Sequence, residues 1–337
     1  MRKFYTLFFI ILTTVSLSAQ DLMKVFEAQK RFEGVNQVIV SGEFCKVGVD
    51  KGDAVQVDAI LNAGKQNDAY QVEMVQEGAI LKVDVMIPAS GWTSHAGSII
   101  ISVPNQVKVD VTTTSGYIDV VGVDESVLKA ESASGKINVS DFKGEANLKS
   151  KSGAITAHNV TGKLTTYNKS GKQEVSHVEG DVVMGTYSGD LHAKHITGKV
   201  ATESTDGAQT LLEITGDVKL KTNSGNLKLS NTKGNVNSVS ASGSFKLFDV
   251  EGVLNLQSTK GEISGSRVKL TASSTFTTTE GKIKFNFDND RSELSYVCES
   301  KNSFIALYGK SKKKKNKTGK GGIVVTATST TGAQAFF

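Results

Sequence analysis

Histidine is the residue type whose spacing most directly suggests chemistry in this chain of 337 residues. His177 and His195 are eighteen residues apart, Glu213 follows after another eighteen, and His192 lies close to His195. Imidazoles beside a carboxylate can bind zinc or another divalent cation, or can act as a general acid and base. These four residues are therefore the candidate metal ligands of the sequence.

The column to which His177 and His195 belong is polar along its whole length. At a spacing of eighteen residues it contains Asp141, Asn159, His177, His195, Glu213, Asn231 and Asp249. A column that is polar throughout is typical of a solvated face, and we favour that interpretation over a metal site. We therefore expect no bound metal, no cofactor and no catalytic residue.

Glycine occupies every ninth position through the centre of the chain, and the series is unbroken. It consists of Gly135, Gly144, Gly153, Gly162, Gly171, Gly180, Gly189, Gly198, Gly207, Gly216, Gly225, Gly234, Gly243, Gly252 and Gly261. The residue before the glycine alternates between serine and a lysine, threonine or glutamate in most repeats, so the full repeat has eighteen residues. Glycines that hold a nucleotide lie between a strand and a helix, whereas these glycines lie between predicted strands.

Apolar residues alternate between the glycines, as in Leu227 and Leu229 of one half-repeat and Val218 and Leu220 of the other. This period of two predicts strands with one inward face. The predicted fold is all-β, a single-stranded parallel β-helix or β-solenoid with coils of eighteen residues. Each coil has two nine-residue halves of strand and turn, and an irregular β cap closes each end. Glycine suits the corners because the chain reverses there within a few residues.

A second column of the repeat contains small polar residues such as Ser150, Thr186 and Ser240. We expect these side chains to form a ladder along one inner edge, hydrogen-bonded to one another.

The sequence predicts four regions. Residues 1–20 have the basic start, short apolar run and small residues of a secretory signal peptide. Residues 21–111 are expected to form an N-terminal β cap, 112–290 the solenoid repeats and 291–337 a C-terminal β cap. We expect an exported protein of the periplasm, the outer-membrane surface or the extracellular space, with no transmembrane span in the mature chain.

Lysines concentrate near the end of the chain, where we predict a loop over residues 310–320. Lys312, Lys313, Lys314 and Lys315 are consecutive and could meet an anionic surface by charge neutralisation. No aromatic residue lies between them, which argues against a nucleic-acid partner because single-stranded nucleic acid stacks on aromatic rings.

Cys45 and Cys298 are the two cysteines of the chain, and they lie far apart in sequence. A disulfide between them would require the two ends of a long solenoid to meet. We therefore expect two separate buried thiols rather than a disulfide or a cysteine-based zinc site.

The segment from Ile99 to Val121, which ends S-G-Y-I-D-V-V, and the S-G-x-I/L-x-V/A units after it resemble the bacterial adhesin-type β-strand-repeat families. These include proteins related to the head GIN domain group, and the start of the chain is similar to export signals of Bacteroidetes. The resemblance implies a β-repeat fold and a location outside the cytoplasm, and it implies no catalytic residues.

Two functions fit this sequence. The first is a non-catalytic, exported structural or interaction module that offers a regular polar face to an envelope protein or a glycan. The second is a β-helix polysaccharide lyase or glycoside hydrolase. Enzymes of the second kind place their catalytic groups in a groove shaped by long loops, and the spacing from Gly135 to Gly261 leaves no room for such loops. We therefore favour the first function.

Overall fold

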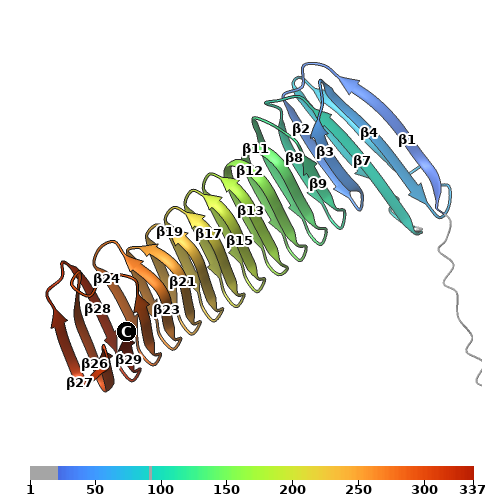
Figure 1. Cartoon of the computed structure of the whole chain (residues 1–337). Coiled ribbons are helices and arrows are strands. Elements are labelled where there is room, and N and C mark those ends of the chain that lie inside the picture. Colours follow the sequence, from blue (N-terminus) through green and yellow to red (C-terminus); the bar gives the residue numbers. More distant parts are fainter. Residues whose placement is uncertain (1–21, 91–92) are drawn as a thin grey trace, which may run out of the picture.

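The computed structural model describes residues 22–90 and 93–337, which form one long rod of β-strands (Figure 1). The coils of the central repeat follow one another in chain order, with β1 (Met23–Phe32) near one end of the rod and the last strands before β29 (Gln334–Phe336) at the other. The predicted parallel β-solenoid with coils of eighteen residues is confirmed. The signal peptide predicted for residues 1–20 lies outside the described residues. Over the described ranges the chain contains no helix with the length and apolar character needed to cross a bilayer.

Two parallel sheets form the long faces of the rod. Face A contains β8 (Lys108–Thr113), β10 (Ser126–Ser132), the second halves of β11 (Ile137–Ser150) and β12 (Ile155–Asn168), β14 (Val182–Thr186), β16 (Val200–Ser204), β18 (Val218–Thr222), β20 (Val236–Ser240), β22 (Leu254–Ser258) and β24 (Ser274–Thr278). Face B contains β9 (Ile118–Val121), the first halves of β11 and β12, β13 (Gln173–Glu179), β15 (Leu191–Thr197), β17 (Gln209–Thr215), β19 (Leu227–Lys233), β21 (Phe245–Gly252), β23 (Ile263–Leu270) and β25 (Ile283–Phe287).

The strands of each face stack in register at the spacing of the sequence repeat. On face A Val200 lies opposite Val218, and on face B Leu211 lies opposite Leu229. The alternate residues that point inward from the two faces form one continuous apolar core, in which Val218 and Leu229 are each 2% exposed. Each coil therefore obtains its hydrogen-bond partners and much of its core from the coils on either side.

The corner glycines meet two different physical requirements. Gly198 has φ +148°, a backbone conformation that other residues rarely adopt. Gly207 has no such φ, but a Cβ atom there would overlap the carbonyl oxygen of Gly189 in the preceding coil. At the corner of Gly198, glycine is required both by the backbone conformation and by the close approach of the preceding coil. At the corner of Gly207, the close approach of the preceding coil alone requires glycine.

The column of small polar residues forms bonds within each coil, and the predicted ladder of mutual hydrogen bonds is wrong for most of it. The hydroxyl oxygen of Ser204 accepts a hydrogen bond from the backbone N–H of Gly207, at 2.8 Å. Thr186 and Gly189 repeat this arrangement at 2.8 Å. The turn amide lies three residues after the hydroxyl and is nearer than the next hydroxyl of the column, so the side chain caps its own corner.

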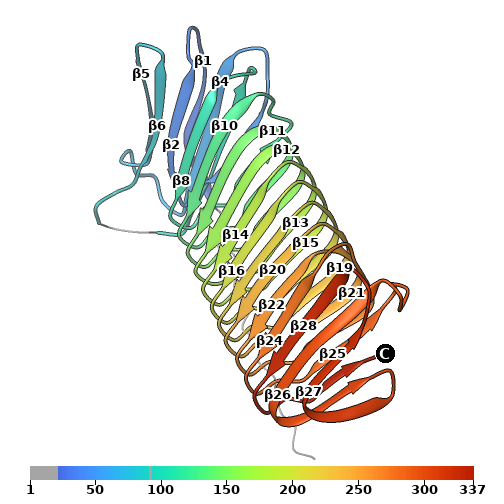
Figure 2. The ribbon, with the colours of Figure 1, turned by 90° about the vertical axis from the view of Figure 1, so that its left-hand side faces the viewer.

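The N-terminal end extends both faces with strands from outside the repeat. It contains β2 (Gln37–Glu43), β3 (Lys46–Lys51), β4 (Val55–Ala63), β5 (Gln71–Glu77), β6 (Ile80–Met86) and β7 (His95–Val103). Strands β2 and β3 pair in parallel with β8 and β9, so they are already a coil of the rod. Strands β6 and β7 add a further layer to the two faces, because they pair in parallel with β2 and β3. Strands β5 and β4 pair antiparallel with β6 and β7 at the outer end, before the chain comes back to β2 and β3 at β8 and β9 (Figure 2).

The C-terminal end closes the rod with β26 (Leu294–Leu307), β27 (Lys310–Gly319), β28 (Ile323–Ser329) and β29. The prediction of a lysine-rich loop over residues 310–320 is wrong, because Lys310–Gly319 form strand β27, paired antiparallel with β26. This strand is the last of the rod, and all its side chains except that of Asn316 are exposed. A strand exposed on both faces lacks the apolar alternation by which strands are recognised in sequence.

Cys45 and Cys298 are both buried and free, as expected, at opposite ends of the rod. Burial raises the pKa of each thiol to about 12, and a thiol is nucleophilic only as the thiolate. Both cysteines therefore act as small apolar core residues.

Candidate functional site

The structure brings three histidine rings together on face B. The ring of His177 lies between those of His158 and His195, with centroid distances of 4.8 Å and 4.5 Å. Nε2 of His195 contacts the carboxylate of Glu213 in the next coil. Desolvation, followed by the positive charges of His195 and His158, lowers the pKa of His177 below its ordinary value.

His192 does not join this group. It lies on β15 opposite Glu174 of β13, in a different column from His177 and His195. Across residues 22–90 and 93–337, no group of three or more His, Cys, Asp or Glu side chains is placed to hold a metal ion. Of the four candidate ligands, the structure therefore assembles His177, His195 and Glu213 in one column and leaves His192 outside it.

A feature of the backbone explains why this column is polar. Its members have φ between 51° and 58°, the left-handed region, where Asn, Asp and His are strongly enriched among residues other than glycine. The column consists of Asp141, Asn159, His177, His195, Glu213, Asn231, Asp249 and, one coil further, Arg267. The backbone turns at this point within face B, so the polar column is a third corner of the coil.

A charged groove lies next to that corner, with a volume of ≈ 470 Å³. Two of its carboxylates pair with cations of the next coil: Asp249 with Arg267, and Glu251 with Lys269 at 3.8 Å. These ion pairs neutralise much of the charge of the groove, although Lys233 and Asp288 line it as well.

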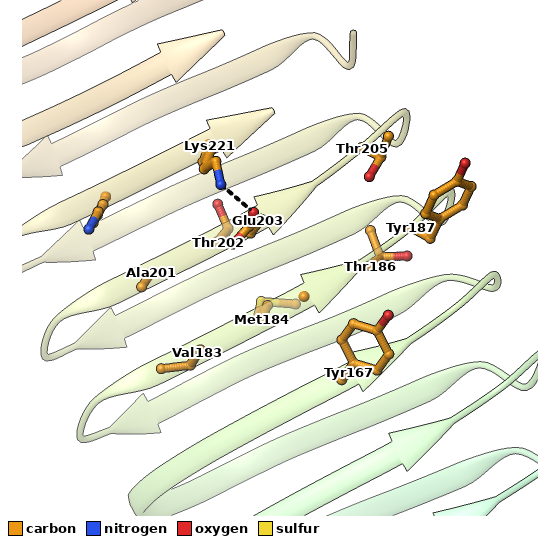
Figure 3. Close-up of a pocket in the computed structure, with 12 residues that line it drawn as sticks. Tyr167, Val183, Met184, Thr186, Tyr187, Ala201, Thr202, Glu203, Thr205 and Lys221 are labelled. Carbon is orange, nitrogen blue, oxygen red and sulfur yellow. Dashed lines mark hydrogen bonds and ion pairs between the residues drawn. The ribbon is translucent and has the colours of Figure 1, made fainter. Parts of the chain in front are cut away.

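The strongest candidate site is a groove on the outward surface of face A, with a volume of ≈ 490 Å³. It is open to solvent and crosses β12, β14, β16 and β18, with Tyr167 and Tyr187 along one side (Figure 3). The two tyrosines are 49% and 53% exposed, although aromatic rings are normally buried. We call this feature the tyrosine groove.

Small residues create the depression. In one outward column Tyr167, Gly185, Glu203 and Lys221 lie side by side in successive coils. In the neighbouring column Ala201 takes a position that is lysine one coil later. The absence of a side chain at Gly185 lets the ring of Tyr167 lie against the next coil and leaves space beyond it.

The far side of the tyrosine groove is charged. Nζ of Lys221 donates a hydrogen bond to a carboxylate oxygen of Glu203 at 2.7 Å, a pair drawn in Figure 3. Lys219 lines the same side. A ligand in the groove would therefore meet aromatic rings on one side and both donors and acceptors on the other.

Two buried glutamines support the floor of the groove from within. Nε2 of Gln173, which crosses the core from face B, donates to the carbonyl oxygen of Gly185 at 2.6 Å. Gln209 does the same for the carbonyl oxygen of Lys221 at 2.8 Å. Both glutamines are fully buried, so these bonds fix the backbone below the groove against a rigid core.

Reasoning from the sequence did not identify the tyrosine groove. A signal was present, since Tyr167 and Tyr187 are the two tyrosines between residues 126 and 290, and both fall at outward positions of the repeat. Inward apolar residues recur in every coil and so give a periodic signal, whereas an outward aromatic residue in two coils gives none.

Comparisons with known proteins place this geometry in context. The model of the family described as Toastrack DUF4097 matches residues 50–212 and 181–332, which together span most of the chain. Among solved structures, the chain is similar to "a putative cell adhesion protein from Clostridium sporogenes ATCC 15579", with 11% identity and a TM-score of 0.21. That match covers 93% of this chain and 99% of the other. The search of curated proteins found no match.

Proposed function

The chain belongs to the Toastrack DUF4097 family, and from that premise we propose that it is an exported, non-catalytic binding module of the cell envelope whose tyrosine groove holds a glycan. The observation that carries the proposal is the exposure of Tyr167 and Tyr187 at one side of a groove with a charged opposite side. The ring faces suit the C–H faces of a sugar, and the Glu203–Lys221 pair suits its hydroxyl groups.

The shape of the groove supports an extended ligand. It crosses four neighbouring strands from Tyr167 to Lys221, a span of roughly 14 Å at the usual spacing between strands. The groove is open along the surface, so a polysaccharide can enter and leave it without a free chain end. A short stretch of a linear glycan, lying along the rod, fits these dimensions better than a compact small molecule.

The charges of the groove support binding without catalysis. Glycoside hydrolases generally use two carboxyl groups, one on each side of the bond that is cleaved. Among the described residues that line the tyrosine groove, Glu203 is the one carboxylate, and it is paired with Lys221. The alternative, a polysaccharide lyase or glycoside hydrolase, would have to assemble its catalytic groups elsewhere on the rod.

Export is part of the proposal and is supported by the sequence of residues 1–20. Sequencing of the N-terminus of the protein made in its own host tests it directly. A mature protein that begins near residue 21 in the envelope or extracellular fraction is expected, and an uncleaved cytoplasmic protein would contradict export.

The binding function is tested by applying the purified chain, from residue 21 onward, to an array of bacterial and host glycans. We expect binding to a limited group of linear oligosaccharides that remain intact afterwards. A parallel assay measures new reducing ends and unsaturated sugar products on the same glycans. Cleavage would favour the enzyme alternative, and an array without any bound glycan would contradict the glycan proposal.

A further inference from the structure

Positive charge is concentrated at the C-terminal end of the rod. Residues 291–337 contain nine lysines and arginines and two aspartates and glutamates. Residues 22–290 contain 28 lysines and arginines and 31 aspartates and glutamates. Seven of the nine cations of residues 291–337 lie on β27 or directly after it, at the last edge of the rod. The rod therefore has a strongly basic tip on a body that is close to neutral.

Most of these lysines have no acidic partner. Nζ of Lys315 pairs with Glu299 at 2.9 Å, and Nζ of Lys313 lies 5.1 Å from the ring centroid of Phe304. Among the described residues, no other lysine of β27 forms an ion pair. Because neighbouring like charges repel one another, the cluster costs stability unless an anion lies against it.

Protection of a strand edge explains only part of this charge. Exposed edge strands commonly carry lysine, which discourages pairing with another chain. The edge strands at the opposite end of the rod carry fewer charges and differ in sign: β1 contains Lys24, Lys30 and Arg31 beside Glu27, whereas β5 contains two glutamates and no cation. Edge protection in this molecule therefore does not require a dense run of lysines.

Exposed aromatic residues accompany the lysines. Phe304 is 53% exposed beside Lys313 of β27. Phe337, directly after β29, is 54% exposed and lies near Lys284 of β25, with Nζ 5.6 Å from its ring centroid. Basic residues interspersed with exposed phenylalanine are typical of surfaces that bind the headgroup region of an anionic membrane. A binding surface for soluble anions would not require the apolar rings.

We infer that the basic tip, formed by β27 with Phe304 and Phe337, docks on the surface of an anionic phospholipid membrane. Lysines on both sides of the strand contact the headgroups, and the two rings enter the boundary between headgroups and acyl chains. Because the tip is the end of the rod, docking holds strands β12, β14 and β16, which carry part of the tyrosine groove, away from the bilayer (Figure 2). This inference does not depend on the proposed glycan.

The test is sedimentation of the chain, from residue 21 onward, with vesicles of phosphatidylcholine that contain increasing phosphatidylglycerol. Binding should rise with phosphatidylglycerol, be absent on pure phosphatidylcholine and weaken as salt is added. A variant with glutamine at four positions of β27 should bind at least about a hundredfold more weakly. Each lysine near an anionic surface adds to the free energy of membrane binding, and this variant lacks four of them. The substituted residues are Lys312, Lys313, Lys314 and Lys315.

A matched control removes the same charge from the body of the rod. It replaces four exposed lysines by glutamine, namely Lys169, Lys228, Lys246 and Lys260. This control should keep at least half of the binding of the unmodified chain, and both variants should melt at the temperature of that chain. Equal losses in the two variants would overturn the inference. If the chain were retained on heparin but did not bind vesicles, the inference would also be overturned. That result would indicate that the basic tip binds an acidic polysaccharide.

Discussion

The ring of Tyr167 lies so close to Gly185 of the neighbouring coil that a Cβ atom added there would be 3.0 Å from Cδ2 of the ring. The tyrosine groove therefore depends on a missing side chain. Gly185→Lys would fill the groove with a side chain that the next coils tolerate in the same column. The ring of Tyr167 must shift by a few tenths of an ångström to admit the new Cβ. We expect glycan binding to weaken at least about tenfold, with a change in unfolding free energy of about 1 kcal/mol or less.

Gly48→Lys is a suitable control for that variant, because an added Cβ there has no neighbour closer than 3.9 Å and lies far from the groove. Titration calorimetry of both variants with an oligosaccharide from the array makes the comparison. Unchanged affinity in Gly185→Lys would show that the ligand binds elsewhere.

His195 lies at the corner formed by the polar column of face B, and this position predicts which substitutions there reduce stability. Its φ of 53° suits asparagine but disfavours a β-branched residue, which clashes with the backbone there. His195→Asn should leave stability nearly unchanged, whereas His195→Val should cost roughly 1–2 kcal/mol, measured by urea unfolding. Valine at His192, on the regular part of β15, should have little effect. A His195→Val chain as stable as His195→Asn would contradict the role of the backbone.

That corner illustrates what the sequence does and does not reveal. The glycine spacing and the alternation at Leu227 and Leu229 predict the coil and its inward faces, because both follow directly from a repeated backbone path. The polar residues at His195 and Asn231 were predicted to be an ordinary solvated face. Polarity alone does not distinguish a solvated strand position from a residue held in the left-handed region.

Two other features were hidden for physical reasons. Strand β27 carries lysine on both faces, so it lacks the alternation that marks a half-buried strand. The coil formed by β2 and β3 lies outside the regular repeat, because the chain forms the outer layers of the rod between Lys51 and Lys108 before β8 and β9 pair with that coil. Periodicity detects coils that are neighbours both in sequence and in space, and this coil is separated in sequence from the coil formed by β8 and β9.

The inward face can be tested with a pair of adjacent residues on β19. Leu229 is 2% exposed in the core, and Lys228 beside it points outward. Leu229→Asp buries an unpaired carboxylate and should cost several kcal/mol, enough to unfold much of the rod, whereas Lys228→Asp should be mild. Circular dichroism during thermal unfolding measures both. Similar damage from the two substitutions would mean that the inward face is assigned wrongly.

The stacked histidines predict that the stability of the folded chain depends on pH. Because the pKa of His177 is lower in the folded chain than its ordinary value of 6.5, the unfolded chain binds that proton more readily. The contribution of His177 to stability is therefore complete above pH 6.5 and is lost as the pH falls below it. Replacing His195 by asparagine removes a neighbouring positive charge and should raise the pKa of His177. An NMR titration in which the pKa of His177 stays the same or falls in His195→Asn would contradict this coupling.

The most direct test of the account is the affinity of the chain for a glycan identified on the array, compared between Tyr167→Ala and Phe248→Ala. Phe248 is an exposed aromatic residue on face B, 43% exposed and remote from the groove, so it controls for the general loss of an aromatic ring. The account predicts that Tyr167→Ala weakens binding at least about tenfold and that Phe248→Ala leaves it unchanged. Equal affinity in both variants and the unmodified chain would contradict a glycan site in the tyrosine groove.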